Sequence, residues 1–279
     1  GVDGAKDRLK ACVLDAFEEP ERYLALGMQP PRGVLLYGPS GTGKTALAHA
    51  LALKIAPFAN FIPVQATEIM SSGMGDSERA IASLFALARQ CAPTVLFIDS
   101  IEALTPPRGS DEASGNSTMD RVLSQFLIEM DGVKTDALRP VMLLGASSSP
   151  DRIDPALLRP GRLEHHILVP PPDETARLQV LQARVNATPH AYTPEGAEAL
   201  VGLAQDTDGF SMADLDLLVR GASLAALRDT ISLRRADATK GVTGTGTDAR
   251  GDVRVSEAHV RQARARGVAS LLGVEIRKP

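Results

Sequence analysis

The residues that decide the fold are Gly38-Pro39-Ser40-Gly41-Thr42-Gly43-Lys44-Thr45. The apolar run Gly33–Tyr37 before them predicts a buried strand, and Ala46–Ile55 after them predicts a helix. A strand, a glycine-rich loop and a helix in this order form the setting in which such a loop binds phosphate. Glycines let backbone N–H groups surround an anion, and the helix N-terminus adds its positive dipole end. The stretch therefore predicts a site for a nucleoside triphosphate.

Two side chains of the loop have separate tasks. Lys44 supplies positive charge to the β- and γ-phosphates, and the Thr45 hydroxyl is a ligand for Mg²⁺. The predicted strand Thr94–Asp99 ends in a carboxylate, and in phosphate-loop enzymes such a carboxylate holds the Mg²⁺ shell. We therefore expect Thr45 and Asp99 at a metal ion. The other expected nucleotide contacts in this region are Pro39, Ser40, Gly41, Thr42, Gly43, Lys44 and Ala46.

Strands alternate with helices in the first part of the chain. Further strands are predicted at 140–146 and 166–169, and helices at 77–90 and 118–130. This alternation predicts an α/β fold, a parallel sheet with helices on both faces. Ligands of such sheets bind at the carboxyl ends of the strands, where the loop and Asp99 both fall.

The pattern becomes helical after Pro170-Pro171-Pro172. Helices are predicted at about 173–187, 193–205, 211–236 and 256–272, with Asp173, Ser211 and Ser256 as N-caps. The stretch 239–252 is rich in Gly and Thr and predicts a mobile loop. We therefore expect a nucleotide-binding domain over 1–172 and a small helical domain over 173–279.

Composition limits the possible partners and surroundings. The 279 residues carry a net charge of −4, so nucleic acid is not an expected partner. No apolar run approaches the roughly 20 residues that span a bilayer, and no signal peptide opens the chain. Cys12 and Cys91 lack metal-ligand spacing, which favours the cytoplasm or another reducing intracellular compartment. A chain that begins with Gly1 rather than Met is consistent with a segment of a longer protein.

Several motifs in a fixed order resemble an AAA ATPase module of the classical clade, which includes valosin-type segregases, peroxisome-biogenesis ATPases, katanin and spastin. The resemblance covers nearly the whole chain. It implies a P-loop NTPase sheet followed by an all-helical lid, ATP and Mg²⁺ as cofactors, and ATP hydrolysis coupled to protein remodelling. Besides the loop, the motifs that carry it are 1–6, 17–20, 27–34, 157–162 and 208–215.

The resemblance also assigns roles to residues outside the loop. Arg159 and Arg162 match paired arginines that reach a neighbouring subunit's ATP, which implies a homo- or hetero-oligomeric ring, usually of six subunits. A protein substrate or adaptor follows from the family activity, and recruitment to an organelle surface is compatible with it. The implied contacts to the base and ribose are Asp3, Gly4, Arg184, Met212 and Ala213.

The chain departs from the family pattern at the catalytic positions. Relatives carry a glutamate that polarises the attacking water where this chain has Ser100, and an asparagine called sensor 1 where it has Ser148. General-base assistance contributes about 10²–10⁴-fold in rate. These losses predict slow or absent hydrolysis, while Lys44, Thr45 and Asp99 predict retained binding. Glu102 replaces the usual aspartate and is a possible substitute base.

Two further departures concern work on a substrate. Gly73 occupies the position of the pore-loop aromatic residue, leaving Met74 as an apolar contact, and Val133 replaces a large aromatic residue used for signalling between subunits. Three hypotheses therefore stay open. The module binds ATP and donates its arginines to an active neighbour, or it is a working ATPase that uses Glu102 or a rearranged water, or it is a nucleotide-sensing scaffold outside any motor.

Overall fold

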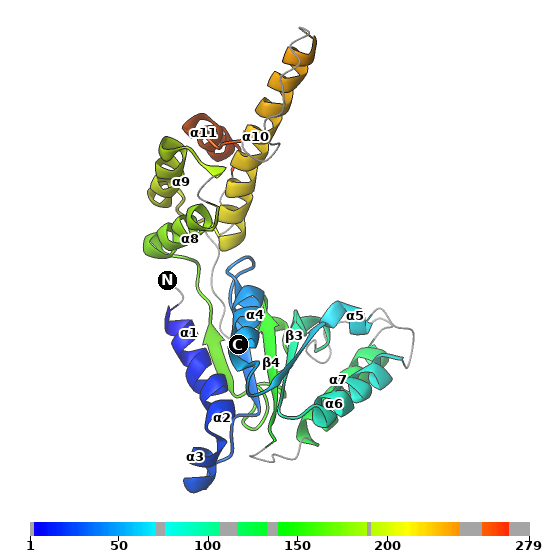
Figure 1. Ribbon diagram of the computed structural model, residues 1–279. Helices are drawn as coiled ribbons and strands as arrows, with labels where there is room; N and C mark the ends of the chain where they lie inside the picture. Colours follow the sequence, from blue (N-terminus) through cyan, green and yellow to red (C-terminus); the bar gives the residue numbers. More distant parts are fainter. Residues whose placement is uncertain are drawn as a thin grey trace. The chain divides into compact units, whose positions relative to one another are not determined.

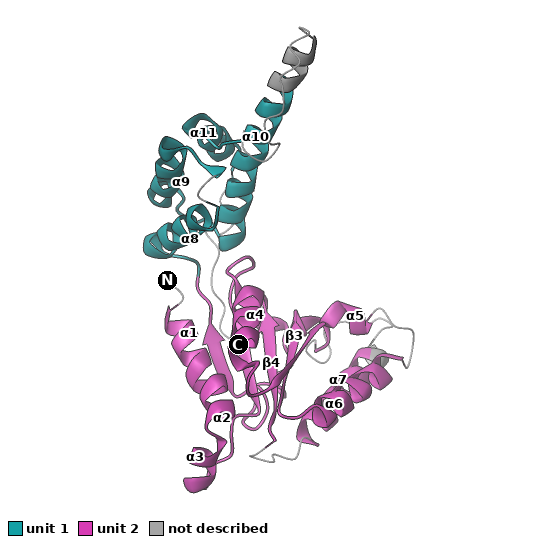
Figure 2. Ribbon diagram, viewed as in Figure 1, with its two compact units in different colours: residues 1, 171–274 teal, residues 2–170, 275–279 magenta. Residues whose placement is uncertain are grey.

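The computed structural model describes residues 3–70, 76–105, 116–132, 139–188, 191–239 and 253–267. The described residues form two compact units, one ending at Pro170 and the other beginning at Pro171 (Figures 1 and 2). Predictions about Gly73, Met74, Val133 and most of the loop 239–252 fall outside the described residues.

The first unit contains a parallel sheet of five strands in the order β2-β3-β4-β1-β5. The prediction of a parallel α/β sheet is confirmed. Strand β2 was not predicted, because Pro63 interrupts its pattern and its side chains are only partly buried. Both features are typical of an edge strand, which is where β2 lies. The strands are β1 (Gly33–Tyr37), β2 (Asn60–Gln65), β3 (Thr94–Asp99), β4 (Val141–Ser147) and β5 (His165–Leu168).

Helices cover both faces of this sheet (Figure 1). Successive strand side chains point to opposite faces, so Val34 and Leu36 pack with α1 and α4, whereas Leu35 packs with α5, α6 and α7. The helical elements of this unit are α1 (Asp3–Leu9), the π-helical turn η1 (Lys10–Leu14), α2 (Asp15–Glu18), α3 (Pro20–Ala25), α4 (Lys44–Ile55), α5 (Ala66–Met70), α6 (Asp76–Gln90), the 3₁₀ turn η2 (Ile101–Ala103), α7 (Asn116–Asp131) and the 3₁₀ turn η3 (Pro150–Arg152).

The register of the strands places three carboxyl ends side by side. Tyr37 at the end of β1 pairs with Ser147 at the end of β4, and Asp99 at the end of β3 pairs with Ala146. The glycine-rich loop follows β1 directly and leads into α4. The loop, the Asp99 carboxylate and the end of β4 therefore meet at one edge of the sheet.

The second unit is helical and has its own apolar core around Leu181, Leu200 and Leu215. The Asp173 carboxylate accepts the Ala176 N–H at 2.8 Å, and Ser211 Oγ accepts the Asp214 N–H at 3.1 Å, as expected for N-caps. Ser256 begins the last helix with a capping box. The helices are α8 (Glu174–Ala187), α9 (Pro194–Asp206), α10 (Met212–Thr239) and α11 (Glu257–Arg266).

Two predicted boundaries in this unit are wrong. Helix α11 ends at Arg266 rather than continuing to 272, because the backbone of Gly267 is extended, with φ −78° and ψ 134°. Helix α10 continues to Thr239, the residue at which a loop was predicted to begin. Gly267 is a residue type that commonly ends helices, so the first boundary was readable in the sequence.

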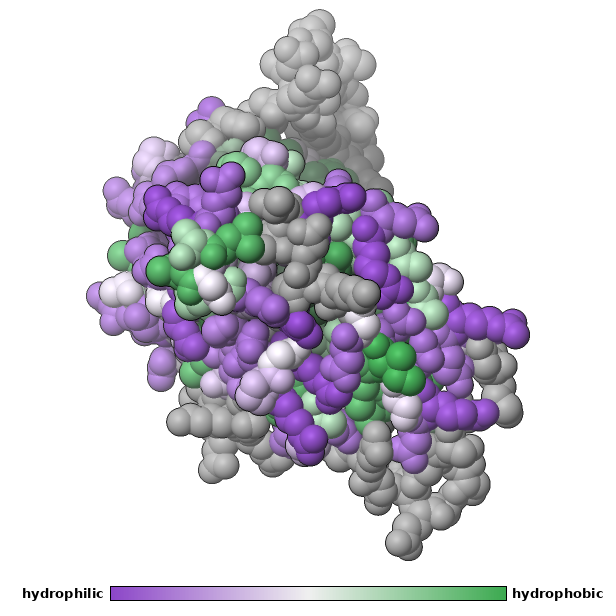
Figure 3. Space-filling view, turned by 90° about the horizontal axis from the view of Figure 1, so that it is seen from below, coloured by the Kyte–Doolittle hydropathy of each residue, from purple (hydrophilic) through white to green (hydrophobic). Residues whose placement is uncertain are grey.

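The face seen in Figure 3 mixes polar side chains with small groups of apolar ones. Such a mixture is usual for globular proteins. None of the helices formed by the described residues combines the length and the apolar character that crossing a membrane requires.

We expect Gly33→Ala to destabilise the first unit by about 1–3 kcal/mol, because overpacking of this size strains a packed core. A Cβ at Gly33 would lie 2.4 Å from the backbone oxygen of Arg162, which no side-chain rotation can relieve. Gly202→Ala in α9 is the matched control, since nothing lies within 4 Å of its added Cβ. The control should stabilise by up to about 1 kcal/mol. Thermal unfolding of both variants tests this, and equal melting temperatures would contradict it.

Candidate nucleotide-binding site

Three glycines shape the loop between β1 and α4. Gly38, Gly41 and Gly43 have φ angles of 148°, 77° and 96°, which residues with a Cβ rarely adopt. A Cβ at Gly38 would also lie 2.3 Å from the backbone oxygen of Val169, the residue that follows β5. The loop therefore keeps its curvature only with glycine at these positions, which is the geometry of a phosphate cradle.

The Lys44 side chain is held inside the loop. Its Nζ donates to the carbonyl oxygens of Gly38 and Pro39, both at 2.8 Å. Burial lowers the pKa of Lys44, and the nearby carboxylates of Glu102 and Asp99 act in the opposite direction. A cation is thus positioned at the cradle, where an arriving phosphate can replace the carbonyl oxygens as its partner.

A short hydrogen bond joins the loop to β3. Thr45 Oγ1 donates to Asp99 Oδ2 at 2.6 Å, and the other carboxylate oxygen accepts the Ser100 N–H at 2.9 Å. These are the two residues predicted at a metal ion. Mg²⁺ usually takes one or two protein oxygens and completes its shell with phosphate and water. The pair fits that role, and the described residues contain no larger metal-binding cluster of His, Cys, Asp and Glu.

Ser100 turns the chain sharply after β3. Its φ of 56° and ψ of 45° lie in the left-handed region, a conformation no other non-glycine residue adopts in the described part of the chain. The turn leads into η2 and brings Glu102 to Ser148, whose backbone N–H donates to Glu102 Oε1 at 3.3 Å. Ser100 presents only a hydroxyl at the position where the family pattern predicts the carboxylate of a glutamate. The fold thus brings Glu102 and Ser148 together.

Arg159 and Arg162 are the two arginines predicted to reach a neighbouring subunit's ATP, a role called an arginine finger, and they differ in their surroundings. Arg162 donates from Nε and Nη2 to the two carboxylate oxygens of Asp131, at 3.0 and 2.7 Å, and from Nη1 to the Ala156 oxygen at 2.6 Å. The Arg159 side chain is exposed and forms no hydrogen bond or ion pair with the described residues, while its backbone oxygen accepts the Arg162 N–H at 3.2 Å. Of these two guanidinium groups, only that of Arg159 is therefore unbonded within the described part of the chain.

The remaining predicted contacts lie on helices. Asp3 and Gly4 lie in the first turn of α1, and Met212 and Ala213 begin α10. Arg184 is paired with Asp216 at 2.6 Å, and this carboxylate also bonds Arg220. The predicted contacts of these residues with the base or ribose stay predictions.

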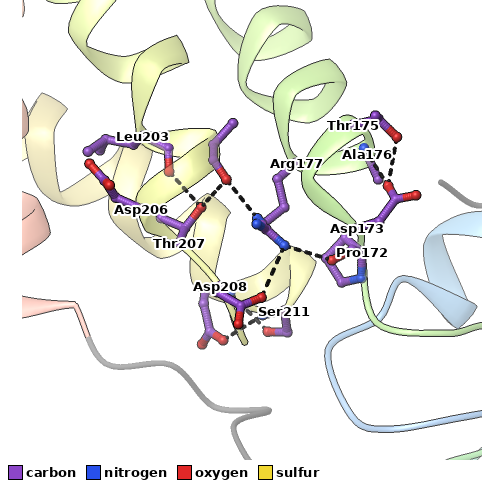
Figure 4. A network of polar contacts seen from close by, with 12 residues as sticks. Pro172, Asp173, Thr175, Ala176, Arg177, Leu203, Asp206, Thr207, Asp208 and Ser211 are labelled. Carbon is purple, nitrogen blue, oxygen red and sulfur yellow. Dashed lines mark hydrogen bonds and ion pairs between the residues drawn. The ribbon is translucent and has the colours of Figure 1, made fainter.

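Arg177 is a polar residue that the sequence analysis missed. Only 5% of it is exposed, yet it donates to the Ala204 oxygen at 3.0 Å and to the Pro172 oxygen at 3.1 Å, with Asp208 at 3.7 Å (Figure 4). It ties the beginning of α8 to the end of α9 and the segment before α10. Its position four residues before the buried Leu181 was the available signal, because i and i+4 share one helix face.

Comparisons with known proteins agree with this geometry. Residues 34–171 match the family model described as "ATPase family associated with various cellular activities (AAA)". Protein SAV of Sulfolobus acidocaldarius is 42% identical over 233 residues, covering 84% of this chain and 29% of that protein. The Cell division cycle protein 48 homolog of Archaeoglobus fulgidus is 42% identical over 231 residues, covering 83% of this chain and 30% of that protein. The chain thus spans less than a third of either relative.

We expect the Asp131–Arg162 pair to stabilise the first unit by at most about 1 kcal/mol, because Asp131 is largely exposed and solvent screens the pair. The hydrogen bond from Arg162 lowers the pKa of Asp131. The contribution is therefore complete above the unfolded pKa of about 4 and is lost as the pH falls through the folded value.

The measurement compares the unfolding free energies of the unchanged chain and Asp131→Asn between pH 7 and pH 3. The difference should shrink as the pH falls. A difference that is constant across this range would show that the Asp131 charge does not stabilise the fold.

Proposed function

Because this chain belongs to the AAA family of ATPases, we propose that it is a nucleotide-holding module of a ring-forming, ATP-driven protein-remodelling machine. In this proposal it binds ATP with Mg²⁺, hydrolyses ATP slowly or not at all, and donates an arginine to a neighbouring subunit. Since the chain covers less than a third of its relatives, the ring, the substrate and the adaptor all belong to the proposal.

The observation that carries the proposal is that the groups for binding phosphate and Mg²⁺ are present, whereas the carboxylate that would activate water is absent. The Lys44 cradle and the Thr45–Asp99 pair supply the cation and the oxygen ligands that phosphate and Mg²⁺ need. Mg²⁺, when bound there, would neutralise phosphate charge. At the next residue Ser100 offers only a hydroxyl, which is no base for water at neutral pH. The site therefore contains the groups needed for binding, but it lacks the base needed for hydrolysis.

The surroundings of the two arginines favour Arg159 as the arginine finger. A finger must place its guanidinium on the transition-state charge of a neighbour's ATP. The guanidinium of Arg159 is exposed and unbonded within the described part of the chain, whereas that of Arg162 donates three hydrogen bonds to Asp131 and Ala156. We infer that Arg162 braces the loop that carries Arg159.

A second candidate function is a self-sufficient ATPase that threads or disassembles protein. The observation in its favour is the Glu102 carboxylate, which accepts the Ser148 N–H next to Ser147, whose carbonyl oxygen accepts the Gly38 N–H of the loop. Cys12 and Cys91 are both free thiols, which fits a reducing compartment such as the cytoplasm. Either candidate function is compatible with such a compartment.

Restoring the two missing groups should create a fast ATPase. We expect Ser100→Glu combined with Ser148→Asn to raise single-turnover hydrolysis by about 10²-fold or more, because general-base assistance is worth that much. ATP affinity should change little. Lys44→Ala in the same background is the control for binding. An unchanged rate in the double variant would argue that these positions do not limit hydrolysis.

The finger should act in trans. In the Ser100→Glu, Ser148→Asn background, Arg159→Ala chains keep ATP but lack the finger, and Lys44→Ala chains lack ATP but keep the finger. Each should be nearly inactive alone, and a mixture should regain hydrolysis, since a finger contributes about 10³–10⁵-fold. A mixture as inactive as its components would place Arg159 outside the neighbour's site.

A further inference from the structure

One acidic group at the site has no task in nucleotide or metal binding. Glu102 Oε1 accepts the Ser148 N–H, but Glu102 Oε2 is buried and meets no donor among the described residues. A buried carboxylate oxygen without a donor loses hydration and gains nothing in return. Such an atom in a native fold calls for a water, an ion or a functional explanation.

The Glu102 carboxylate lies beside the loop where the β- and γ-phosphates are expected. Glu102 accepts the N–H of Ser148, and the carbonyl oxygen of the preceding Ser147 accepts the Gly38 N–H of the loop at 3.3 Å, so Glu102 lies beside the loop that holds Lys44. Its charge also opposes the lowering of the Lys44 pKa by burial. Lys44 is also the residue that meets the β- and γ-phosphates. Asp99 acts on Lys44 too, but both of its oxygens already accept hydrogen bonds, from Thr45 Oγ1 and the Ser100 N–H. Asp99 is also expected at Mg²⁺, which would compensate its charge, whereas Glu102 adds a carboxylate charge with no expected metal ion beside it.

The backbone fixes that charge in place. The left-handed turn at Ser100 and the following 3₁₀ turn direct residue 102 back toward the end of β4. The Ser148 N–H then holds one carboxylate oxygen. A fixed charge with few mobile dipoles around it acts more strongly than one in water.

We propose that Glu102 sets the nucleotide preference of the site by opposing the γ-phosphate of ATP while leaving ADP binding almost unchanged. The proposal rests on the proposed function, since a nucleotide must first bind at the loop. ADP lacks the terminal phosphate and its negative charge, so a fixed carboxylate penalises the two nucleotides unequally. The chain with Glu102 holds ADP at least as well as ATP and stays occupied in either state.

The test is calorimetric titration of the full chain with Mg²⁺ and either ADP or a non-hydrolysable ATP analogue. Glu102→Gln removes the charge and keeps the shape. It should tighten binding of the analogue by about tenfold, the order of magnitude of the interaction between two unit charges at an effective dielectric constant of about 20 to 80, and ADP binding by less than twofold. Glu102→Ala should act in the same direction, and Glu102→Asp should keep the original preference. Glu21→Gln, an exposed glutamate of α3, is the matched control and should change neither value.

Two results would overturn the proposal. Equal changes for both ligands, or none, would mean that Glu102 does not distinguish them. An unchanged preference together with loss of slow hydrolysis in Glu102→Gln would instead identify Glu102 as the base. Failure of the proposed function looks different, because the unchanged chain would then bind neither ligand and would match Lys44→Ala.

Discussion

The hydrogen bond from Thr45 to Asp99, at 2.6 Å, joins the first turn of α4 to the end of β3. It forms only because β1, β3 and β4 run parallel and end at the same edge of the sheet. The curvature of the glycine loop and the placement of Lys44 depend on that edge as well. Everything we propose about nucleotide binding therefore rests on the register of three strands.

The same edge separates binding from catalysis. In our proposal, binding uses groups that the fold already holds in place, namely the loop N–H groups, Lys44 and the Thr45–Asp99 pair. Catalysis in the family needs a carboxylate directly after β3 and an amide directly after β4, and this chain has Ser100 and Ser148 there. A chain can lose those two groups and keep its fold, because neither Ser100 nor Ser148 belongs to an apolar core. In our proposal, this module has lost turnover in this way and still donates an arginine to its neighbours.

The sequence predicted the features that depend on local pattern. The strand, loop and helix at 33–55, the carboxylate at Asp99 and the parallel sheet follow from residue order alone. Strand β2 was not predicted, because Pro63 interrupts the strand pattern and is tolerated only since β2 lies at the edge of the sheet. The sequence also could not show that Arg162 is bonded to Asp131 or that Glu102 meets the Ser148 backbone. These contacts join residues 31 and 46 positions apart, and no periodic pattern encodes them.

The most direct test of the account is single-turnover hydrolysis of ATP by the unchanged chain, at a concentration that allows oligomers, beside equilibrium binding of ATP. We predict saturable binding with Mg²⁺ and almost no turnover on the time scale of active family members. Rapid turnover in the unchanged chain would contradict it, because Ser100 and Ser148 would then not limit the chemistry.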